Sequence, residues 1–371
     1  MASSSALSRR AFGRLIGRGM AAATLPPLFA AGEAGARAPA AAGGVVRLSA
    51  NENPYGPSPA ALRAMREAFS LAWRYPDEAG EELASDLVKL HGLPKGSFLI
   101  GDGSSEILKL AASAFTGAGR KLVMADPTFE AIGVHARVHG AEIVTVPLDG
   151  QYAHDLDKMT VDGAGLVYLC NPNNPTGSIT PKARVRAFLD AIPSSATVLV
   201  DEAYHHYADS PDYESVVPLV ATHPNLIVAR TFSKIHGMAG LRLGYAIAQR
   251  PAIEKLAAHA AWDSANIIAL AAGRASLLDT AYVAEGRRRN AATKAQVVAE
   301  LDWLGFQVVP SQTNFILIDV RKEVKPVIEA LRERRVLVGR LFPALPRHLR
   351  VTIGTPAQMK RFLEAFAAVV V

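Results

Sequence analysis

The chain carries two patterns of hydrophobic and polar positions, and the first gives way to the second near residue 260. From residue 98 to residue 248, short apolar runs are bounded by turn residues, which is typical of strands buried on both faces. These runs are Phe98–Ile100, Lys121–Met124, Glu142–Pro147, Leu166–Leu169, Thr197–Val200, Leu226–Arg230 and Gly244–Ala248. Helical patterns such as Glu106–Phe115 and Pro181–Ala191 lie between several of them. The alternation predicts an α/β fold in which helices cover both faces of a mostly parallel sheet.

The C-terminal part of the chain has longer helical stretches. Ile267–Leu278 and Ala284–Leu304 come first, and Pro356–Val371 closes the chain. Between them lie four short runs with strand character, Gln307–Val309, Asn314–Asp319, Val336–Val338 and Leu349–Thr352. This arrangement predicts a smaller α+β unit.

The part that precedes the first predicted strand contains two amphipathic helical patterns, Ala60–Ser70 and Glu81–His91. Val45–Pro59 is rich in Pro and Asn, which predicts an extended arm. We therefore divide the chain into a leader (residues 1–38), an arm that belongs partly to the small domain (39–74), a large ligand-binding domain (75–262) and a small C-terminal domain (263–371).

The leader is similar to a twin-arginine export signal in Ser8-Arg9-Arg10-Ala11-Phe12, which an apolar stretch follows up to Ala31. Gly19 and the pair Pro26-Pro27 interrupt this stretch, so it is too weak for a stable membrane span. Small residues then offer cleavage sites, such as the one after Ala36. The twin-arginine route exports folded proteins across a membrane. The signal therefore predicts that this protein is periplasmic or exported. If the leader is only a basic tail, the protein is cytoplasmic.

Charge and cysteine content argue against several classes of protein. The formal net charge is +6, of which the first 36 residues contribute +3, so about +3 remains for the rest of the chain. So small an excess does not support nucleic-acid binding. The single cysteine, Cys170, follows an apolar run and is expected to be buried, and no intrachain disulfide is possible. Without a CxxC motif or a His/Cys cluster, we expect no metal site.

A lysine stands directly after a predicted buried strand, in Thr231-Phe232-Ser233-Lys234. Open α/β sheets bind ligands at the carboxyl ends of their strands. A lysine that is partly desolvated there stays neutral enough to form an imine. The hydroxyls of Thr231 and Ser233 and the guanidinium of Arg242 could together hold a phosphate. A lone loop lysine is ordinarily solvated, so this interpretation depends on the neighbouring motifs.

Asp201-Glu202-Ala203-Tyr204 follows the predicted strand Thr197–Val200. A carboxylate at the end of a buried strand needs a partner. Pyridoxal phosphate offers one, because its ring nitrogen is best kept protonated by a carboxylate. Tyr204 could reach the ring hydroxyl of the same molecule. Taken alone, Asp201 is equally well explained as a helix N-cap.

Two turns complete the set. Asn171-Pro172-Asn173-Asn174-Pro175-Thr176-Gly177 forms a rigid turn in which the Asn side chains face a cleft. Gly101-Asp102-Gly103-Ser104-Ser105-Glu106 stands between a predicted strand and a helix, where glycines let the backbone approach an anion and the helix offers free N–H groups. By itself, each motif is also explained as an ordinary turn.

Together the four motifs fit one ligand with a phosphate, an aromatic ring and an aldehyde. Their order, GDGSSE, NPNNPTG, DEAY and TFSKIHGMAGLRLG, resembles fold-type-I pyridoxal-phosphate enzymes of the aspartate aminotransferase superfamily. Within the class I/II aminotransferases, the segments 51–57, 75–77 and 349–355 are similar to the histidinol-phosphate aminotransferase branch. The resemblance covers roughly residues 45–370. It implies an aspartate-aminotransferase-like fold, with a mostly parallel seven-stranded sheet in the large domain and a small α+β domain.

The resemblance also implies roles for single residues, with pyridoxal 5′-phosphate as the cofactor. Lys234 would hold the cofactor as a Schiff base and move a proton, and Asp201 would pair with the ring nitrogen. Asn174 and Tyr204 would bind the ring hydroxyl, and Phe129 would stack on the ring. The phosphate would be bound by Ser104, Ser105, Thr231, Ser233 and Arg242.

The same resemblance implies a homodimer, in which Tyr75 reaches the phosphate in the neighbouring subunit's site. Arg350 would bind the carboxylate or phosphate of the substrate, and Arg340 and Tyr55 would line the same pocket. The expected partners are a small-molecule amino donor and a 2-oxo acid acceptor. We expect no nucleic acid and no stable membrane span.

Three activities fit these residues. The first is transamination between an amino acid, or histidinol phosphate, and a 2-oxo acid. The second is decarboxylation of a phosphorylated amino acid on the same scaffold. The third is non-catalytic binding, which is disfavoured because Lys234, Asp201 and Arg242 are all present. The branch usually carries a Pro-aromatic-Asn-Val stretch where this chain has Trp262–Asn266, so the substrate stays open.

Overall fold

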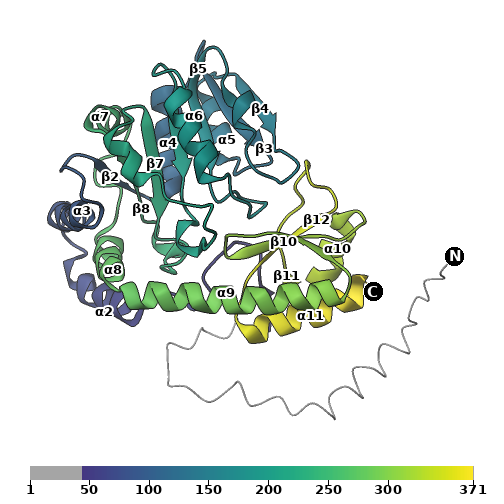
Figure 1. Ribbon diagram of the computed structural model, residues 1–371. Coiled ribbons are helices and arrows are strands. Elements are labelled where there is room, and N and C mark those ends of the chain that lie inside the picture. Colours follow the sequence, from purple (N-terminus) through teal and green to yellow (C-terminus); the bar gives the residue numbers. More distant parts are fainter. Residues whose placement is uncertain (1–43, 371) are drawn as a thin grey trace.

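The computed structural model describes residues 44–370 of the chain, so the predicted leader lies outside the described residues. A large α/β unit lies beside a smaller α+β unit, and the long helix α9 (Thr280–Trp303) runs along both of them (Figure 1). The division of the chain at residues 38, 74 and 262 stays a prediction.

A seven-stranded sheet forms the centre of the large unit, in the order β2-β8-β7-β6-β5-β3-β4. Its strands are β2 (Phe98–Gly101), β3 (Lys121–Asp126), β4 (Ile143–Pro147), β5 (Ala164–Cys170), β6 (Thr197–Asp201), β7 (Leu226–Thr231) and β8 (Gly244–Ala248). Strands β3 to β7 pair in parallel, whereas β8 is antiparallel to both β7 and β2. The mostly parallel sheet is confirmed. The direction of β8 could not be predicted, because an apolar run has the same composition in either direction.

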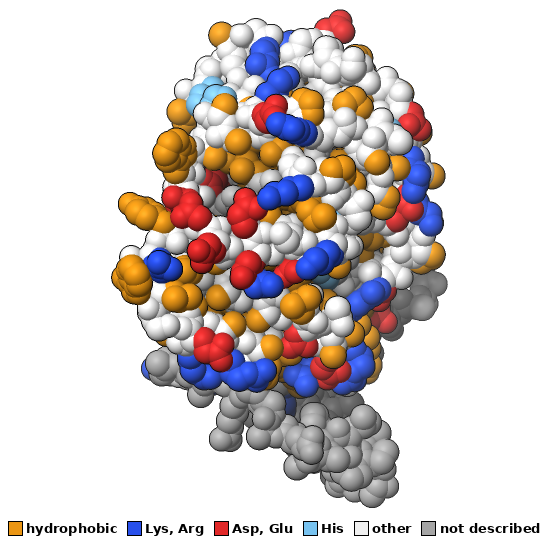
Figure 2. Space-filling model, turned by 90° about the vertical axis from the view of Figure 1, so that its left-hand side faces the viewer, with side chains coloured by type: hydrophobic (Ala, Val, Ile, Leu, Met, Phe, Trp, Pro, Cys, Tyr) orange, Lys and Arg blue, Asp and Glu red, His pale blue; other side chains and the backbone are white. Residues whose placement is uncertain are grey.

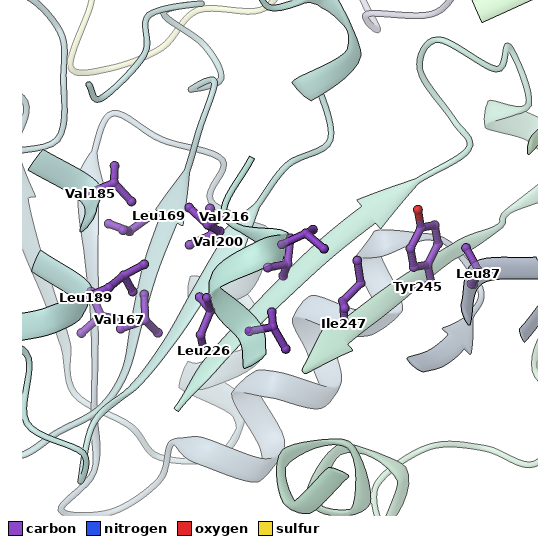
Figure 3. Close-up of a cluster of buried hydrophobic side chains, with 14 of the residues drawn as sticks. Leu87, Val167, Leu169, Val185, Leu189, Val200, Val216, Leu226, Tyr245 and Ile247 are labelled. Atoms are coloured by element: carbon purple, nitrogen blue, oxygen red, sulfur yellow. The ribbon is translucent and has the colours of Figure 1, made fainter. Parts of the chain in front are cut away.

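Side chains alternate along the central strands, so each face of the sheet has its own core. Val167 and Leu169 of β5 face one core, and Leu166 and Tyr168 face the other. Figure 3 shows part of the first core, in which Val185 of α6 lies near Leu169 and Leu189 of α6 lies near Val167. Helices α2 (Pro59–Ala68), α3 (Asp77–His91), α6 (Lys182–Ala191) and α8 (Ile267–Leu278) contribute to this core. Helices α4 (Ser104–Phe115), α5 (Ala131–Val138) and α7 (Arg250–Ala257) contribute to the second core.

The smaller unit combines a three-stranded antiparallel sheet, in the order β12-β10-β9, with a parallel pair of strands, β1 and β11. Its elements are β1 (Val46–Arg47), β9 (Gln307–Val309), β10 (Phe315–Asp319), α10 (Val324–Glu333), β11 (Val336–Leu337), β12 (His348–Thr352) and α11 (Pro356–Val370). The predicted arm begins in this unit, because Val46 of β1 pairs with Val336 of β11. The backbone N–H of Thr352 donates to the carbonyl of Leu48, which leads the arm onward to the boundary between the two units.

The boundaries of the predicted elements agree with the observed ones to within four residues. The helix predicted over Ala60–Ser70 begins at Pro59, after the cap Ser58, and ends at Ala68. Helix α5 was not predicted, because its eight residues are too short for a clear apolar repeat. Short 3₁₀ turns lie at Phe69–Leu71, Leu156–Met159, His205–Tyr207, Val217–Ala221 and Ala239–Leu241. Among residues 44–370, no single helix has the length and apolar composition of a membrane span. Only α8 and α9 taken together, with a 79° bend, meet that criterion, and on length and composition alone.

Candidate active site

One pocket lies where the carboxyl ends of β5, β6 and β7 meet the arm and the loop between β11 and β12. The expected site residues that line it are Ser104, Ser105, Phe129, Asn174, Asp201, Tyr204, Thr231, Ser233, Lys234, Arg242, Arg340 and Arg350. Ala50, Asn51, Thr128, Glu130, Cys170, Ala203, Ala239 and Phe342 also line it. The structure therefore brings together residues that lie up to 300 positions apart in the sequence.

Lys234 lies just beyond the end of β7, with its amine inside the pocket. Its Nζ donates a 3.3 Å hydrogen bond to the carbonyl of Asn51 and lies 5.5 Å from the centroid of the Tyr204 ring. Burial lowers the pKa of this amine to about 8, and the charge of Arg350 acts in the same direction, whereas Asp201 opposes it. The lowered pKa increases the unprotonated fraction of the amine near neutral pH, which is the form that attacks an aldehyde.

Asp201 is the last residue of β6 and is buried. Its Oδ1 accepts a hydrogen bond from the backbone N–H of Ala203, and its Oδ2 accepts one from the hydroxyl of Tyr168, both at 3.0 Å. Burial raises the pKa of this carboxyl to about 6, although the two hydrogen bonds and Lys234 favour the charged form. A cationic N–H group in the pocket would relieve this cost, and a protonated ring nitrogen is such a group.

Two amides direct polar groups toward the same space. The Nδ2 of Asn51 donates to the hydroxyl of Tyr204 at 3.0 Å. The Oδ1 of Asn174 accepts a 2.6 Å hydrogen bond from Arg350, so the Nδ2 end of this amide is the one that can donate to a ligand. Burial raises the pKa of the Tyr204 phenol, which therefore keeps its proton over the physiological range.

The start of α4 and the guanidinium of Arg242 form a cradle for an anion. Ser104 and Ser105 begin the helix, whose first N–H groups have no helical partner. Arg242 donates to Ser233 Oγ at 3.4 Å and to the carbonyl of Asp102 at 3.3 Å. Thr231 donates to Ser233 at 2.9 Å, so the two hydroxyls lie side by side.

Gly103 is the residue that makes room for this cradle. A Cβ at this position would lie 2.2 Å from Nη2 of Arg242, and the φ angle of 78° is one that side chains rarely adopt. The cradle fits a phosphate dianion, Asp201 fits a protonated ring nitrogen, and Lys234 fits an aldehyde. The residues present therefore fit pyridoxal phosphate.

Arg350 of β12 is buried at the other end of the pocket. Its Nη2 donates to the carbonyl of Ser49 at 2.8 Å, and its guanidinium lies 5.5 Å and 5.2 Å from the ring centroids of Phe315 and Phe342. Its buried Nε has no hydrogen-bond partner among the described residues. Burial lowers the pKa of this guanidinium. A fixed cation with a free donor suits a carboxylate ligand.

Arg340 follows β11 and lies at the open side of the pocket. Its Nη2 donates to Oε1 of Glu130 at 2.7 Å, and its guanidinium lies 4.5 Å from the centroid of the Phe342 ring. Both members of this ion pair are about half exposed. Arg340 and Arg350 thus share one aromatic ring as a neighbour.

Tyr55 does not join this pocket within one chain. It lines a separate hollow, in which the guanidinium of Arg289 lies 4.9 Å from its ring centroid. The hydroxyl of Tyr282 on α9 donates to the carbonyl of Gly56 at 2.8 Å and holds this segment to the helix. The structure therefore does not place Tyr55 beside Arg340 as the sequence predicted.

Tyr75 also lies away from the pocket. Its side chain is 81% exposed and lines a surface hollow together with Trp262, which is 95% exposed. The role of Tyr75 in a second subunit stays a prediction. Among the residues that the structure describes, no cluster of His, Cys, Asp and Glu could hold a metal ion.

Sequence reasoning gave no site role to eight of the lining residues, and three of these contact other site residues through their side chains: Asn51, Glu130 and Phe342. Asn51 stands in a segment that was noted only for its resemblance. Glu130 follows Phe129 directly, and nothing local marks it as part of a site. Phe342 lies two residues after Arg340, and only the folded chain reveals that its buried ring lines the pocket beside two arginines.

Comparisons with known proteins identify the family of this chain. The model of the family "Aminotransferase class I and II" matches residues 43–366. A histidinol-phosphate aminotransferase of Symbiobacterium thermophilum is 42% identical over 328 residues, which cover 87% of this chain and 90% of that protein. Histidinol-phosphate aminotransferase 2 of Pseudomonas fluorescens is 38% identical over 329 residues, which cover 88% and 89%.

A solved structure extends this likeness to the fold. The crystal structure of histidinol-phosphate aminotransferase from Sinorhizobium meliloti, in complex with pyridoxal-5′-phosphate, is similar with a TM-score of 0.83 and 29% identity. The match covers 88% of this chain and 91% of that chain. The expected fold, family and cofactor are confirmed. The chain belongs to the class I and II aminotransferases and is a pyridoxal-phosphate-dependent enzyme of that family.

Proposed function

We propose that this enzyme moves an amino group between an amino acid and a 2-oxo acid, with its cofactor carried on Lys234. The observation that carries the proposal is the pairing of Lys234 and Asp201 in one pocket, where burial brings both pKa values toward neutrality. Pyridoxal phosphate supplies an electron sink for negative charge at the α-carbon of the substrate. Asp201 holds the proton of the ring nitrogen, and the amine of Lys234 moves the proton at the α-carbon.

The other pocket residues hold the cofactor in place. Asn174 and Tyr204 bind the ring hydroxyl, and Phe129 packs on the ring. The phosphate is held by Ser104, Ser105, Thr231, Ser233 and Arg242. Arg350 binds the substrate carboxylate through its free Nε, and Arg340 faces the substrate side chain. Several relatives are named histidinol-phosphate aminotransferases, so histidinol phosphate is the first donor to test.

A panel of amino acids and phosphorylated amines tests this function. Each donor is added to the cofactor-loaded protein, and the absorbance band of the lysine-bound cofactor is followed. Transamination converts the band into that of a stable amine form, which a 2-oxo acid then reverses. Release of carbon dioxide would instead favour the decarboxylase alternative. A protein with no lysine-bound absorbance, even after pyridoxal phosphate is added, would favour non-catalytic binding.

We further propose that the enzyme is a homodimer in which Tyr75 serves the partner's phosphate site. Large hydrophobic side chains are exposed near α2 and α8, namely Phe69 (63%), Leu71 (44%), Trp73 (77%), Tyr75 (81%) and Trp262 (95%). Hydrophobic side chains stand out on the face seen in Figure 2, which is the left-hand side of Figure 1. Exposed apolar patches of this kind mark protein interfaces. Light scattering gives the molecular mass of the assembly. Tyr75→Phe is expected to weaken cofactor binding without changing that mass.

We also propose that the enzyme is exported by the twin-arginine route. Ser8-Arg9-Arg10-Ala11-Phe12 supports this proposal. Cell fractionation of the full chain and of an Arg9→Lys/Arg10→Lys variant tests it. We expect the variant to stay in the cytoplasm and the unchanged protein to leave it. Equal distribution of the two proteins would contradict the proposal.

A further inference from the structure

The substrate end of the pocket carries more positive charge than one substrate carboxylate can balance. Arg350 and Arg340 both line the pocket and both lie against the ring of Phe342. The positive charge of Arg340 also disfavours the charged form of Arg350. If Arg350 takes the carboxylate of the substrate, Arg340 still needs an anion. Glu130 now fills that place.

Two features distinguish Glu130 from an ordinary surface partner. It lines the pocket itself, and Asp201, the other carboxylate among the lining residues, is committed to hydrogen bonds from Ala203 and Tyr168. Its ion pair with Arg340 also joins residues 210 positions apart and links the large unit to the small unit across the pocket. Glu130 is 62% exposed in this pair, so its carboxylate can move into solvent at little cost.

We infer that Glu130 is a specificity-determining residue, which acts as an exchangeable partner of Arg340. A substrate side chain that carries an anion displaces Glu130 and binds Arg340. When the side chain is neutral, Glu130 keeps Arg340 paired, so no unpartnered cation is covered by the substrate. This inference rests on the proposed function, in which Arg350 binds the substrate carboxylate.

The proposed reaction requires one pocket to bind two different substrates, and the exchange of Glu130 would allow this. Donor and acceptor would occupy the same pocket in turn, because the proposed transfer of the amino group has two half-reactions. A fixed cation alone would favour anionic side chains and reject neutral ones, since covering an unpaired charge costs free energy. A mobile carboxylate reduces both the preference for anionic side chains and the penalty for neutral ones. One pocket then accepts both classes of side chain.

Two unreactive ligands separate the two classes without any turnover. Glutarate carries a second carboxylate, and 3-phenylpropionate carries an apolar ring in its place. Binding of each to the cofactor-loaded enzyme is measured by calorimetry. We expect Glu130→Gln to tighten glutarate about threefold and to weaken 3-phenylpropionate by a similar factor, which is the size of one exposed ion pair. The same variant should lower KM for glutamate and raise it for phenylalanine.

Two controls test whether the effect passes through Arg340. Glu254→Gln removes a matched ion pair outside the pocket, since Glu254 is 61% exposed and accepts a hydrogen bond from Arg250 at 2.7 Å. This variant should change the dissociation constant of neither ligand. In an Arg340→Gln background, Glu130→Gln should no longer change the ratio of the two dissociation constants. The inference is overturned if Glu130→Gln leaves this ratio unchanged in the Arg340 enzyme, or if its effect persists without Arg340.

The two proposals fail in different ways. If the unchanged enzyme transfers no amino group from any donor, the proposed function fails, while the binding ratio is still measured. If transfer occurs but glutarate binds neither protein, or both ligands respond alike to Glu130→Gln, the role of Glu130 fails and the proposed function stands.

Discussion

Asp201 and Glu202 are neighbours in the sequence, yet they lie in two regions that satisfy their charges in opposite ways. Asp201 faces the pocket and receives hydrogen bonds from two uncharged groups. Glu202 faces away from the pocket and forms a buried ion pair with Arg230, whose Nη2 lies 2.8 Å from its Oε2. The hydroxyl of Ser215 and the N–H of Val216 also donate to Glu202, so both of its oxygens have partners.

The difference separates charges that serve folding from charges that serve a ligand. The Glu202–Arg230 pair is complete within the chain, and nothing further is needed to stabilise it. In the pocket, burial works against the charged forms of Asp201 and Lys234. Such incompletely satisfied groups are typical of functional sites, where a bound ligand supplies the missing partner. The contrast predicts that substitutions in the two regions have different consequences.

The largest expected effect is the loss of activity in Lys234→Met. The substitution keeps the length of the side chain but removes the amine, so we expect kcat to fall by at least about 10³-fold. The apoprotein should be no less stable than the wild type, because a buried amine with a lowered pKa is replaced by an apolar group. Steady-state kinetics and urea unfolding measure the two quantities. Retained turnover would contradict the role of Lys234.

Glu202→Gln should have the opposite profile. The substitution leaves the buried Arg230 without a charged partner, and breaking a buried pair in this way costs about 3 kcal/mol of folding free energy. Urea unfolding followed by circular dichroism measures the loss, and the folded fraction should still bind cofactor. Glu254→Gln breaks an exposed pair and should cost less than about 1 kcal/mol. Equal losses in the two variants would refute the distinction between the regions.

A smaller effect is expected at the phosphate cradle, in Gly103→Ala. The added methyl group would lie against Arg242, and the backbone would be held at an unfavourable φ angle. We expect the dissociation constant of pyridoxal phosphate to rise by about 10- to 100-fold, as for the loss of one or two charge-assisted hydrogen bonds. An absorbance titration measures it.

Gly80→Ala is the matched control for this substitution. Gly80 lies within α3, and a Cβ there meets no atom within 4 Å. We expect unchanged cofactor binding and a gain in stability of about 0.5 kcal/mol, because alanine restricts the unfolded chain. If Gly80→Ala weakened cofactor binding as much as Gly103→Ala, the steric explanation at Gly103 would be wrong.

The fold was largely predictable because burial on both faces leaves a clear mark on the strands of a parallel sheet. Leu226–Arg230 and Gly244–Ala248 were both located correctly, although only the structure reveals that β8 runs antiparallel to β7. The helices α5 and α7 were not predicted, because eight residues give only about two turns of a repeat. Helix α10 was also not predicted, although its ten residues are as many as those of α2 and α6.

The candidate site divides in a similar way. Residues such as Lys234 and Asp201 stand at strand ends, and the order of the strands alone brings them together. Tyr55 and Glu130 depend on the paths of loops, which are set by distant contacts such as Tyr282 with Gly56. Local sequence does not contain those contacts, so Tyr55 was expected in the pocket and Glu130 was overlooked.

The pH dependence of stability gives the most gradual effect, and it has opposite signs for the two pocket groups. The pKa of Asp201 is raised from 3.8 to about 6 in the native apoprotein. Between these values the native state binds more protons than the unfolded state, so this group makes stability fall as the pH rises. The pKa of Lys234 is lowered from 10.5 to about 8, so the unfolded state binds more protons between pH 8 and 10.5. There, stability rises with pH.

Each contribution is limited to about 1.4 kcal/mol per pH unit, and a variant that lacks the group reveals it by difference. Urea unfolding of the apoprotein is measured from pH 4 to 10.5 for the wild type, Asp201→Asn and Lys234→Met. Subtracting the Asp201→Asn curve from the wild type should leave a fall between pH 4 and 6, and subtracting the Lys234→Met curve should leave a rise above pH 8. Bound cofactor should reduce both differences in stability, because it supplies a partner for Asp201 and for Lys234 that the chain itself does not supply. Parallel curves would mean that neither group is held in an unfavourable state, and the contrast with the Glu202–Arg230 pair would then have no energetic basis.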